Sequence, residues 1–298
     1  MTGTELDLYT NEEPSHNLAF NLFGGTWSSN IPGFGLGTGT LFEDGRIQWL
    51  EQVCDGIAGK SVLELGPLEG GHTFMLANAG ASSILAIESN AKAFLKCLLV
   101  QNALKFSAEF MYGDFRKVLQ RREQHFDMIL ASGVLYHMTD PVALLEDMAH
   151  ASNSICLWTH YYDSDVAATN ASMQKHISAT PSTSEFRTRS IHMHRQDYLD
   201  NLENKKFIGG SSSHSNWLTR ESLLGILDDL GMTVIIGRDD SDHAAGPSIL
   251  LYATRISDFD ESGYLERHPD VARAVDNGQF KSGQEHYIRF GKNEGRSL

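Results

Sequence analysis

One stretch near residue 60 indicates how the chain folds, and it reads Ser61-Val62-Leu63-Glu64-Leu65-Gly66-Pro67-Leu68-Glu69-Gly70-Gly71-His72-Thr73. A short apolar run ends at Gly66, and an apolar pattern at helical spacing begins near Thr73. This order predicts a buried parallel strand, a glycine-containing turn and the start of a helix. Glycines let the backbone approach an anionic ligand, and the first N–H groups of a helix can donate to it. The stretch therefore predicts a nucleotide-cofactor turn, although many doubly wound proteins carry such a unit without a ligand there.

Two carboxylates accompany this turn. Glu64 lies inside the first strand, where burying a carboxylate is costly unless it has partners. Glu88 ends the next apolar run, residues 83–88, at the place where folds of this kind bind ribose hydroxyls. Both acids are thus positioned to contact a nucleotide cofactor.

An acid within the first strand resembles motif I of the class I S-adenosylmethionine-dependent methyltransferases, whereas dinucleotide-binding turns normally place their first acid after the second strand. The sequence departs from that family at Leu68, which replaces the middle glycine of Gly-x-Gly-x-Gly and follows Pro67. The turn must therefore take another path, and no role is assigned to Leu68 or Glu69.

The third strand, expected over residues 108–112, is followed by Gly113-Asp114-Phe115. A carboxylate and an aromatic ring at a strand end suit the exocyclic amine and the face of a purine. In the methyltransferase family this position lies near the adenine. Asp114 can also simply cap the helix that begins at Phe115, and the two roles are compatible.

The stretch after the fourth strand, residues 126–131, carries the most specific resemblance. Residues 133–141 read Gly-Val-Leu-Tyr-His-x-x-Asp-Pro and, with the preceding Phe-Asp-x-Ile, look like class I methyltransferases, above all the wobble-uridine tRNA-modifying methyltransferases. Ser132 and Gly133 would let backbone carbonyls reach the methionine moiety. His137 could contact the methionine or the substrate, and a capping or core role is equally open.

Polar rings follow the fifth strand, residues 154–159, at the sheet edge where open α/β folds bind ligands. If the acceptor is a hydroxyl, a base assists, and His160, Tyr161 and His137 are the catalytic candidates by location. The resemblance implies cofactor contacts from Glu64, Gly66, Gly70, His72, Glu88, Asn90, Asp114, Phe115, Ser132 and Gly133.

The segment 163–216 is too long for an ordinary connection, and by analogy it is expected to cap the substrate. His192 and His194 could face one side of a strand and bind a metal, but no third ligand accompanies them, so no metal site is predicted. Two strands, over residues 233–236 and 248–253, should complete the sheet. The expected fold is α/β: a doubly wound, mostly parallel seven-stranded sheet.

The chain is divided into three parts by composition. Residues 1–58 form a glycine- and aromatic-rich segment with an amphipathic helix over 42–57, and the segment is either a lid over the cofactor or a cover for the sheet. Residues 59–256 are the methyltransferase domain that the resemblance implies. Residues 257–298 resemble a small helical module appended to bacterial glycosyltransferases, and it must lean on the main domain or a partner. Its expected packing residues are Tyr264, Leu265, Val271, Phe280, Tyr287 and Phe290.

Composition limits the partners. The net charge of −14 opposes a large contact with a phosphate backbone, so nucleic acid is disfavoured but not excluded. No apolar stretch is long enough to cross a bilayer, and the N-terminus has no signal-peptide pattern. The three cysteines lack metal spacing and should be reduced core residues, which predicts a cytoplasmic protein without a membrane partner. Nothing in the sequence indicates the oligomeric state.

These observations predict an S-adenosylmethionine-dependent methyltransferase, with S-adenosylhomocysteine as product and a small-molecule or sugar-type acceptor. Three alternatives stay open. The Gly133–Pro141 stretch points to tRNA, with basic clusters at 117–122, 187–195 and 205–206 as its contacts. An NAD(P)-dependent oxidoreductase would share the glycine turn and the acid at the end of the second strand. A non-catalytic binding protein would need neither the turn nor that acid.

Overall fold

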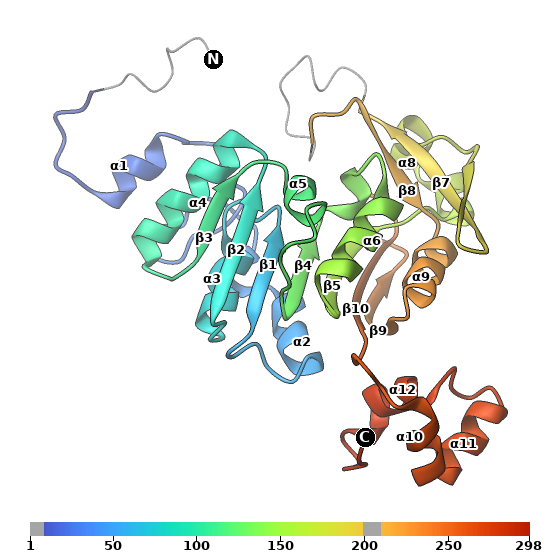
Figure 1. The fold of residues 1–298 in the computed structure, drawn as a ribbon. Coiled ribbons are helices and arrows are strands. Elements are labelled where there is room, and N and C mark those ends of the chain that lie inside the picture. Colours follow the sequence, from blue (N-terminus) through green and yellow to red (C-terminus); the bar gives the residue numbers. More distant parts are fainter. Residues whose placement is uncertain (1–8, 199–209) are drawn as a thin grey trace.

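The structure is a computed structural model that describes residues 9–198 and 210–298. Its main feature is a seven-stranded sheet in the order β3-β2-β1-β4-β5-β10-β9 (Figure 1). The strands are β1 (Ser61–Leu65), β2 (Ser83–Glu88), β3 (Glu109–Tyr112), β4 (Met128–Ser132), β5 (Ser154–His160), β9 (Thr233–Asp240) and β10 (Ser248–Thr254). β10 pairs antiparallel with both β5 and β9, and all other neighbouring strands of this sheet pair parallel. The predicted doubly wound, mostly parallel seven-stranded sheet is confirmed.

Helices cover both faces of the sheet, because successive strand residues point to opposite sides and each strand is apolar on both. On one face, Leu63, Ile129 and Leu157 pack against α5 (Phe115–Leu119), α6 (Pro141–Ala151) and α9 (Arg220–Asp229). On the other, Val62 and Met128 pack against α2 (Gly45–Val53) and α3 (Gly71–Asn78). The two hydrophobic cores so formed hold the carboxyl ends of the strands rigidly.

The chain order creates a ligand-binding edge. From β1 the chain moves outward through β2 and β3, then returns to β4 on the other side of β1. Such a reversal leaves a crevice at the carboxyl ends of the two strands that flank it. β1, β2 and β4 all end at this crevice.

The N-terminal segment packs on the helices beside β2 and β3. Helix α1 (His16–Asn21) lies against α4 (Ala91–Leu104), at the blue end of the ribbon in Figure 1. Aromatic rings of this N-terminal segment, among them Phe20, Trp27 and Phe42, form a third hydrophobic cluster with Val100 of α4. A short 3-10 turn, Leu41–Glu43, then leads into α2. From α1 onward the segment is thus part of the folded core.

The helix predicted over 42–57 is shorter than expected. It starts only after Asp44, whose carboxylate caps it by accepting from Arg46 N. It ends at Val53 because Asp55 and Gly56 both adopt left-handed φ angles, which a helix cannot continue through.

Between β5 and α9 the chain builds a separate layer. It contains α7 (Ser164–Thr169), α8 (Ala171–His176) and an antiparallel sheet of β6 (Ser182–Phe186), β7 (Arg189–Asp197) and β8 (His214–Leu218). We call the described residues of this layer, 163–198 and 210–218, the cap. β8 contacts the 3-10 turn Leu135–His137 that follows β4, so the cap is held beside the ligand-binding edge. The expected basic cluster at 205–206 lies outside the described residues.

The C-terminal region is helical: α10 (Glu261–Arg267), α11 (Pro269–Asp276), α12 (Gly283–His286) and a π-helical turn, Tyr287–Gly291. It follows the end of β10 and lies opposite the ligand-binding edge (Figure 1). Because β10 runs antiparallel to β5, it ends at the edge of the sheet where β5 begins. Tyr264 and Val271 are fully buried there as expected. Phe290 is 47% exposed, and its ring still packs edge-on against Phe280 with the ring centres 5.7 Å apart. Polar contacts such as Lys281 Nζ to Asp228 Oδ1 (2.9 Å) join the region to α9.

Across residues 9–198 and 210–298, we find no helix with the length and apolarity that a membrane crossing requires.

Candidate active site

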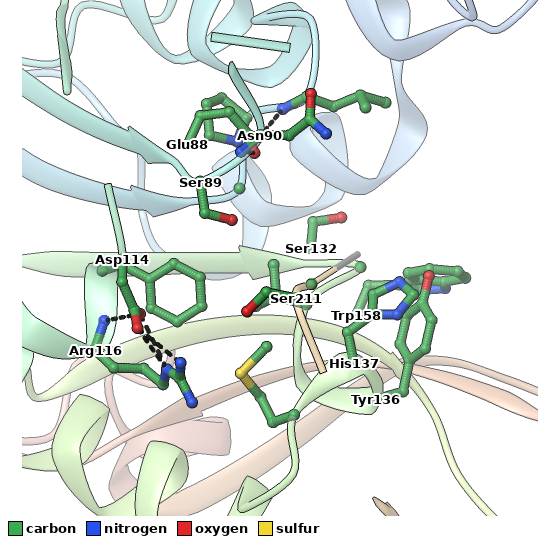
Figure 2. Close-up of a pocket in the computed structure, with 18 of the residues that line it drawn as sticks. Glu88, Ser89, Asn90, Asp114, Arg116, Ser132, Tyr136, His137, Trp158 and Ser211 are labelled. Atoms are coloured by element: carbon green, nitrogen blue, oxygen red, sulfur yellow. Dashed lines mark hydrogen bonds and ion pairs between the residues drawn. The ribbon is translucent and has the colours of Figure 1, made fainter. Parts of the chain in front are cut away.

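A cavity of about 540 Å³ opens at the carboxyl ends of β1, β2 and β4. This volume lies within the range of roughly 300–1,000 Å³ typical of small-molecule sites. Polar side chains from the strand ends and from the cap surround it (Figure 2). Its lining includes Leu41, Arg46, Gly66, His72, Glu88, Asn90, Asp114, Phe115, Arg116, Ser132, Gly133, Tyr136, His137, Trp158 and Ser211.

The turn after β1 reaches this cavity by an unusual path. Gly66, Leu68 and Gly70 all have left-handed φ angles, of 67°, 56° and 76°. Leu68 therefore adopts a left-handed backbone conformation that glycine takes up far more readily than leucine. A left-handed φ costs an L-residue about 1–2 kcal/mol. The gain is that Leu68 N donates to Glu88 Oε2 at 3.1 Å, which joins the turn to β2.

This strain gives a testable ordering of stabilities. We expect the Leu68→Gly variant to be more stable than Leu68→Ala by about 1 kcal/mol, because both lose the leucine contacts and only glycine relieves the backbone. Elsewhere alanine is normally the more stable of the two. Urea unfolding of both variants measures the difference, and an alanine variant equal to or better than glycine would show that the turn is not strained.

Glu88 is the best-placed carboxylate in the cavity. Its two oxygens accept from Leu68 N (3.1 Å) and Asn90 N (2.7 Å), and Asn90 also caps α4. Each oxygen keeps a further lone pair for a ligand. Burial raises the pKa of Glu88, although these backbone donors oppose the shift. The arrangement suits a ligand that offers two hydroxyl groups, such as a ribose.

Glu64 is placed differently from Glu88, because it does not line the cavity. Its side chain is buried below the turn and accepts from Thr73 Oγ1 at 2.5 Å. Burial raises its pKa to about 7, with a smaller contribution from Glu88. The hydrogen bond between Thr73 and Glu64 thus joins the first turn of α3 to β1.

The raised pKa of Glu64 predicts a pH dependence of stability. Between pH about 4.5 and 7 the folded protein holds a proton on Glu64 that the unfolded chain has lost, so the free energy of unfolding falls as pH rises through this window. Glu64→Gln should remove this part of the slope, because an amide cannot titrate. Urea unfolding of both proteins at pH 5 and 7.5 tests the expectation, and parallel slopes would contradict it.

The end of the cavity nearest β3 is formed by Asp114, Phe115 and Arg116. Asp114 caps α5 by accepting from Arg116 N at 3.0 Å, and it pairs with the Arg116 guanidinium at 2.7 Å (Figure 2). The hydrogen bonds from Arg116 lower the pKa of Asp114, so the carboxylate is an acceptor at neutral pH. Both open interpretations of Asp114 are therefore compatible with its position, as cap and as cavity wall.

The N-terminal segment supplies a polar network on another side. Asp44 accepts from His72 Nε2 (2.9 Å) and Arg46 Nε (2.9 Å), while Arg46 Nη1 donates to Ser132 Oγ (2.9 Å). Although burial alone would raise it, the pKa of Asp44 is held well below its usual range by the hydrogen bonds from His72 and Arg46. The Arg46 guanidinium also lies 4.8 Å from the Trp158 ring centre. Helix α2 is thereby locked to β4 and β5.

The three catalytic candidates lie in different surroundings. His137 lines the cavity beside Tyr136 and Trp158 (Figure 2). His160 and Tyr161 are outside its lining. Tyr161 points toward β9 and donates to Asp239 Oδ1 at 2.8 Å, and His160 Nδ1 donates to the carbonyl of Gly246 at 3.0 Å.

Comparison with known proteins agrees with this geometry. Residues 63–152 match the methyltransferase domain family. The chain carries a methyltransferase domain. The tRNA U34 carboxymethyltransferase of Campylobacter hominis is 29% identical over 112 residues, a match that spans only 37% of this chain and 39% of that relative.

Solved structures share the fold of the methyltransferase domain. The N-terminal domain of EvdMO1, crystallised with S-adenosylhomocysteine and D-fucose, superposes with a TM-score of 0.56 at 23% identity. That alignment covers 74% of this chain and 87% of the EvdMO1 domain. The whole of EvdMO1 aligns with a TM-score of 0.50 at 20% identity, and the match covers 82% of this chain and 52% of EvdMO1. At these identities the likeness is one of fold.

Most residues predicted to hold a cofactor do reach the cavity of the methyltransferase domain. Gly70 and Glu64 lie behind its wall instead. At Gly70 an added Cβ would make only an ordinary contact with the Phe110 ring, at 3.4 Å, so the left-handed φ of 76° is what favours glycine there. The sequence did not point to Arg46, Arg116, Trp158 or Ser211 as lining residues. His192 and His194 do not act together, because His192 is exposed while His194 is buried against Tyr162, and the described part of the chain holds no group of three or more potential metal ligands.

Proposed function

We propose that this protein transfers a methyl group from S-adenosylmethionine to a small, sugar-type acceptor. The observation that carries the proposal is Glu88, which presents two carboxylate oxygens beside the glycine turn of a methyltransferase domain. A dinucleotide-dependent oxidoreductase would give no role to Asp114 or to the Gly133–Pro141 segment, yet both contribute to the wall of the same cavity.

The cavity fits the cofactor by its donor set. Glu88 would bind the ribose hydroxyls, Asp114 and Phe115 would contact the adenine, and Gly66 and Gly133 would face the methionine part. At Gly66 the φ is left-handed and an added Cβ would lie 3.2 Å from Val134 Cγ2, so a side chain there would disturb the turn beside the cavity. When bound, S-adenosylmethionine would supply an electrophilic methyl group, and its sulfur would keep the electron pair of the broken bond as S-adenosylhomocysteine.

Two observations favour a small acceptor over tRNA. Two basic side chains of the cap are already paired with carboxylates: Arg189 with Asp229 at 3.0 Å and Arg195 with Asp197 at 2.8 Å. Such groups are poor at neutralising phosphates, which is the main source of affinity for nucleic acids. In addition, a protein of the same fold was crystallised in the presence of D-fucose. The partial match to a tRNA-modifying relative keeps tRNA as the second candidate.

The acceptor is tested by methyl transfer from labelled S-adenosylmethionine to total tRNA and, in parallel, to a small-metabolite extract at several salt concentrations. We expect label in the metabolite fraction, with little dependence on salt. Labelling of tRNA alone, falling steeply as salt rises, would instead assign the protein to nucleic-acid modification.

A further inference from the structure

A line of hydrogen bonds runs from the cap to the cavity and ends at His137. Trp217 Nε1 and Ser215 Oγ both lie within hydrogen-bond distance of Gln196 Oε1, at 2.9 Å and 3.0 Å. Tyr198 OH lies 3.1 Å from Ser215 Oγ, and His137 Nδ1 lies 2.8 Å from Tyr198 OH. We call Gln196, Ser215 and Tyr198, with Trp217 as their anchor, the relay.

The direction of every bond in the relay follows from its fixed end. The indole N–H of Trp217 can only donate, so the atom of Gln196 that faces it is the carbonyl oxygen. That oxygen has no proton, and Ser215 must therefore donate to it. Ser215 then accepts from Tyr198, whose only proton is used in this bond.

Tyr198 can consequently offer His137 only a lone pair, and Nδ1 of His137 must carry the proton. In a neutral imidazole this leaves Nε2, on the far side of the ring, unprotonated. Burial, with a smaller effect of His160, lowers the pKa of His137 to about 4, so the ring is neutral at pH 7. His137 lines the cavity, and no described residue forms a hydrogen bond with its Nε2.

The relay is held rigidly against the loop that carries His137. Asn216, between Ser215 and Trp217 in β8, donates from its backbone N to Met138 O at 2.8 Å and from Nδ2 to Thr139 O at 2.6 Å. Tyr198, Ser215 and Trp217 are each at most 7% exposed. Water therefore has little access to replace a member of the relay.

We propose that His137 is the catalytic base of the methyl transfer, and that Tyr198, Ser215 and Gln196 are positioning residues that keep its Nε2 free for the acceptor. The inference rests on the proposed function and narrows it to an acceptor hydroxyl, which must lose a proton when its oxygen attacks. The acceptor O–H bond would break and its proton move to Nε2, while the oxygen would bond the methyl group as the sulfur–methyl bond breaks and leaves its electron pair on sulfur. The imidazolium then returns the proton to solvent.

The first test reads the tautomer of His137 and needs no acceptor. The probe is ¹⁵N NMR of histidine-labelled protein at pH 7.5, with the His137 signals assigned from a His137→Gln variant. We expect a proton on Nδ1 and none on Nε2 in the unmodified chain. In Ser215→Ala, Tyr198 is free to donate to Nδ1, so the proton should move to Nε2, whereas Gln196→Glu keeps the acceptor oxygen and should keep the tautomer.

The second test measures transfer of labelled methyl groups into the metabolite extract. Ser215→Ala and Tyr198→Phe should lower the turnover number roughly 10- to 100-fold, less than the roughly 10²- to 10⁴-fold of losing a general base outright, because both variants keep the His137 ring. The affinity for S-adenosylhomocysteine should not change. Tyr252→Phe is the matched control, because it removes another largely buried tyrosine hydroxyl, one that bonds Ser154 Oγ at 3.0 Å and lies outside the cavity lining.

A proton on Nε2 of His137 in the unmodified protein would overturn the inference, and so would a Ser215→Ala variant with the original tautomer and full turnover. If one variant fails to fold, the tautomer of the unmodified protein and of the other variants still decides. If the unmodified protein does not bind S-adenosylhomocysteine, the proposed function is contradicted. The tautomer of His137 would still be determined in that case.

Discussion

Replacing Glu88 by alanine is expected to weaken the binding of S-adenosylhomocysteine by roughly 10- to 150-fold, about 1.5–3 kcal/mol, the scale of hydrogen bonds to a charged group. The carboxylate has a lone pair free on each oxygen toward the cavity, and alanine offers none. The protein should stay folded, because the turn keeps Gly66 and Gly70 in their left-handed conformations. Calorimetric titration of the folded variant measures the loss.

The matched control for this prediction is Glu109→Ala. Glu109 is an exposed carboxylate on the neighbouring strand β3, and it does not line the cavity. Its removal should leave the affinity within a factor of about two, since an exposed charge outside the cavity interacts weakly with a ligand there. Equal affinities for the Glu88 variant and the unmodified protein would refute the assignment of Glu88 to the ribose.

A larger effect, on stability rather than binding, is expected for Lys96→Met. Lys96 Nζ donates to Glu69 Oε1 at 2.8 Å, and both side chains are almost fully buried. Glu69 also accepts from the backbone N atoms of Ser28 and Ser29, at 2.9 Å and 2.8 Å, so the pair joins the N-terminal segment to the turn after β1. Removing one partner of a buried pair leaves the other charge uncompensated, which costs about 3–5 kcal/mol.

Urea unfolding compares Lys96→Met with Lys92→Met. Lys92 lies in the same helix, α4, and is exposed, so its replacement should change the free energy of unfolding by less than about 0.5 kcal/mol. A loss below about 1 kcal/mol for Lys96→Met would mean that the pair adds little to the folded state, and that the N-terminal segment is held by its apolar cluster instead.

The fold could be predicted because its signals are local. Strand runs such as 61–65 and 83–88, the glycine turn and the cap at Asp114 each depend on a few adjacent residues. Glu88 and Asp114 could be found because a strand end fixes where the next residue lies. The motif left His137 either at the ligand or in a capping or core role, and His137 lines the cavity.

Other parts of the site depend on contacts between distant residues. Arg46 reaches Ser132 across 86 positions of sequence, and Glu69 meets the N-terminal segment across about 40. His160 and Tyr161 follow the right strand, but neighbouring residues at a strand end point to different sides, and the bonds to Gly246 and Asp239 that draw them away are long-range. The relay joins residues of β7 and β8 that pair only after the cap has folded.

The most direct test of the proposed function is a calorimetric titration of the unmodified protein with S-adenosylhomocysteine, beside titrations with NAD and NADP. We predict binding of S-adenosylhomocysteine with a dissociation constant in the micromolar range, roughly −8 kcal/mol, and no heat of binding for either dinucleotide. Binding of NAD or NADP without binding of S-adenosylhomocysteine would contradict the account and assign the cavity to a dinucleotide.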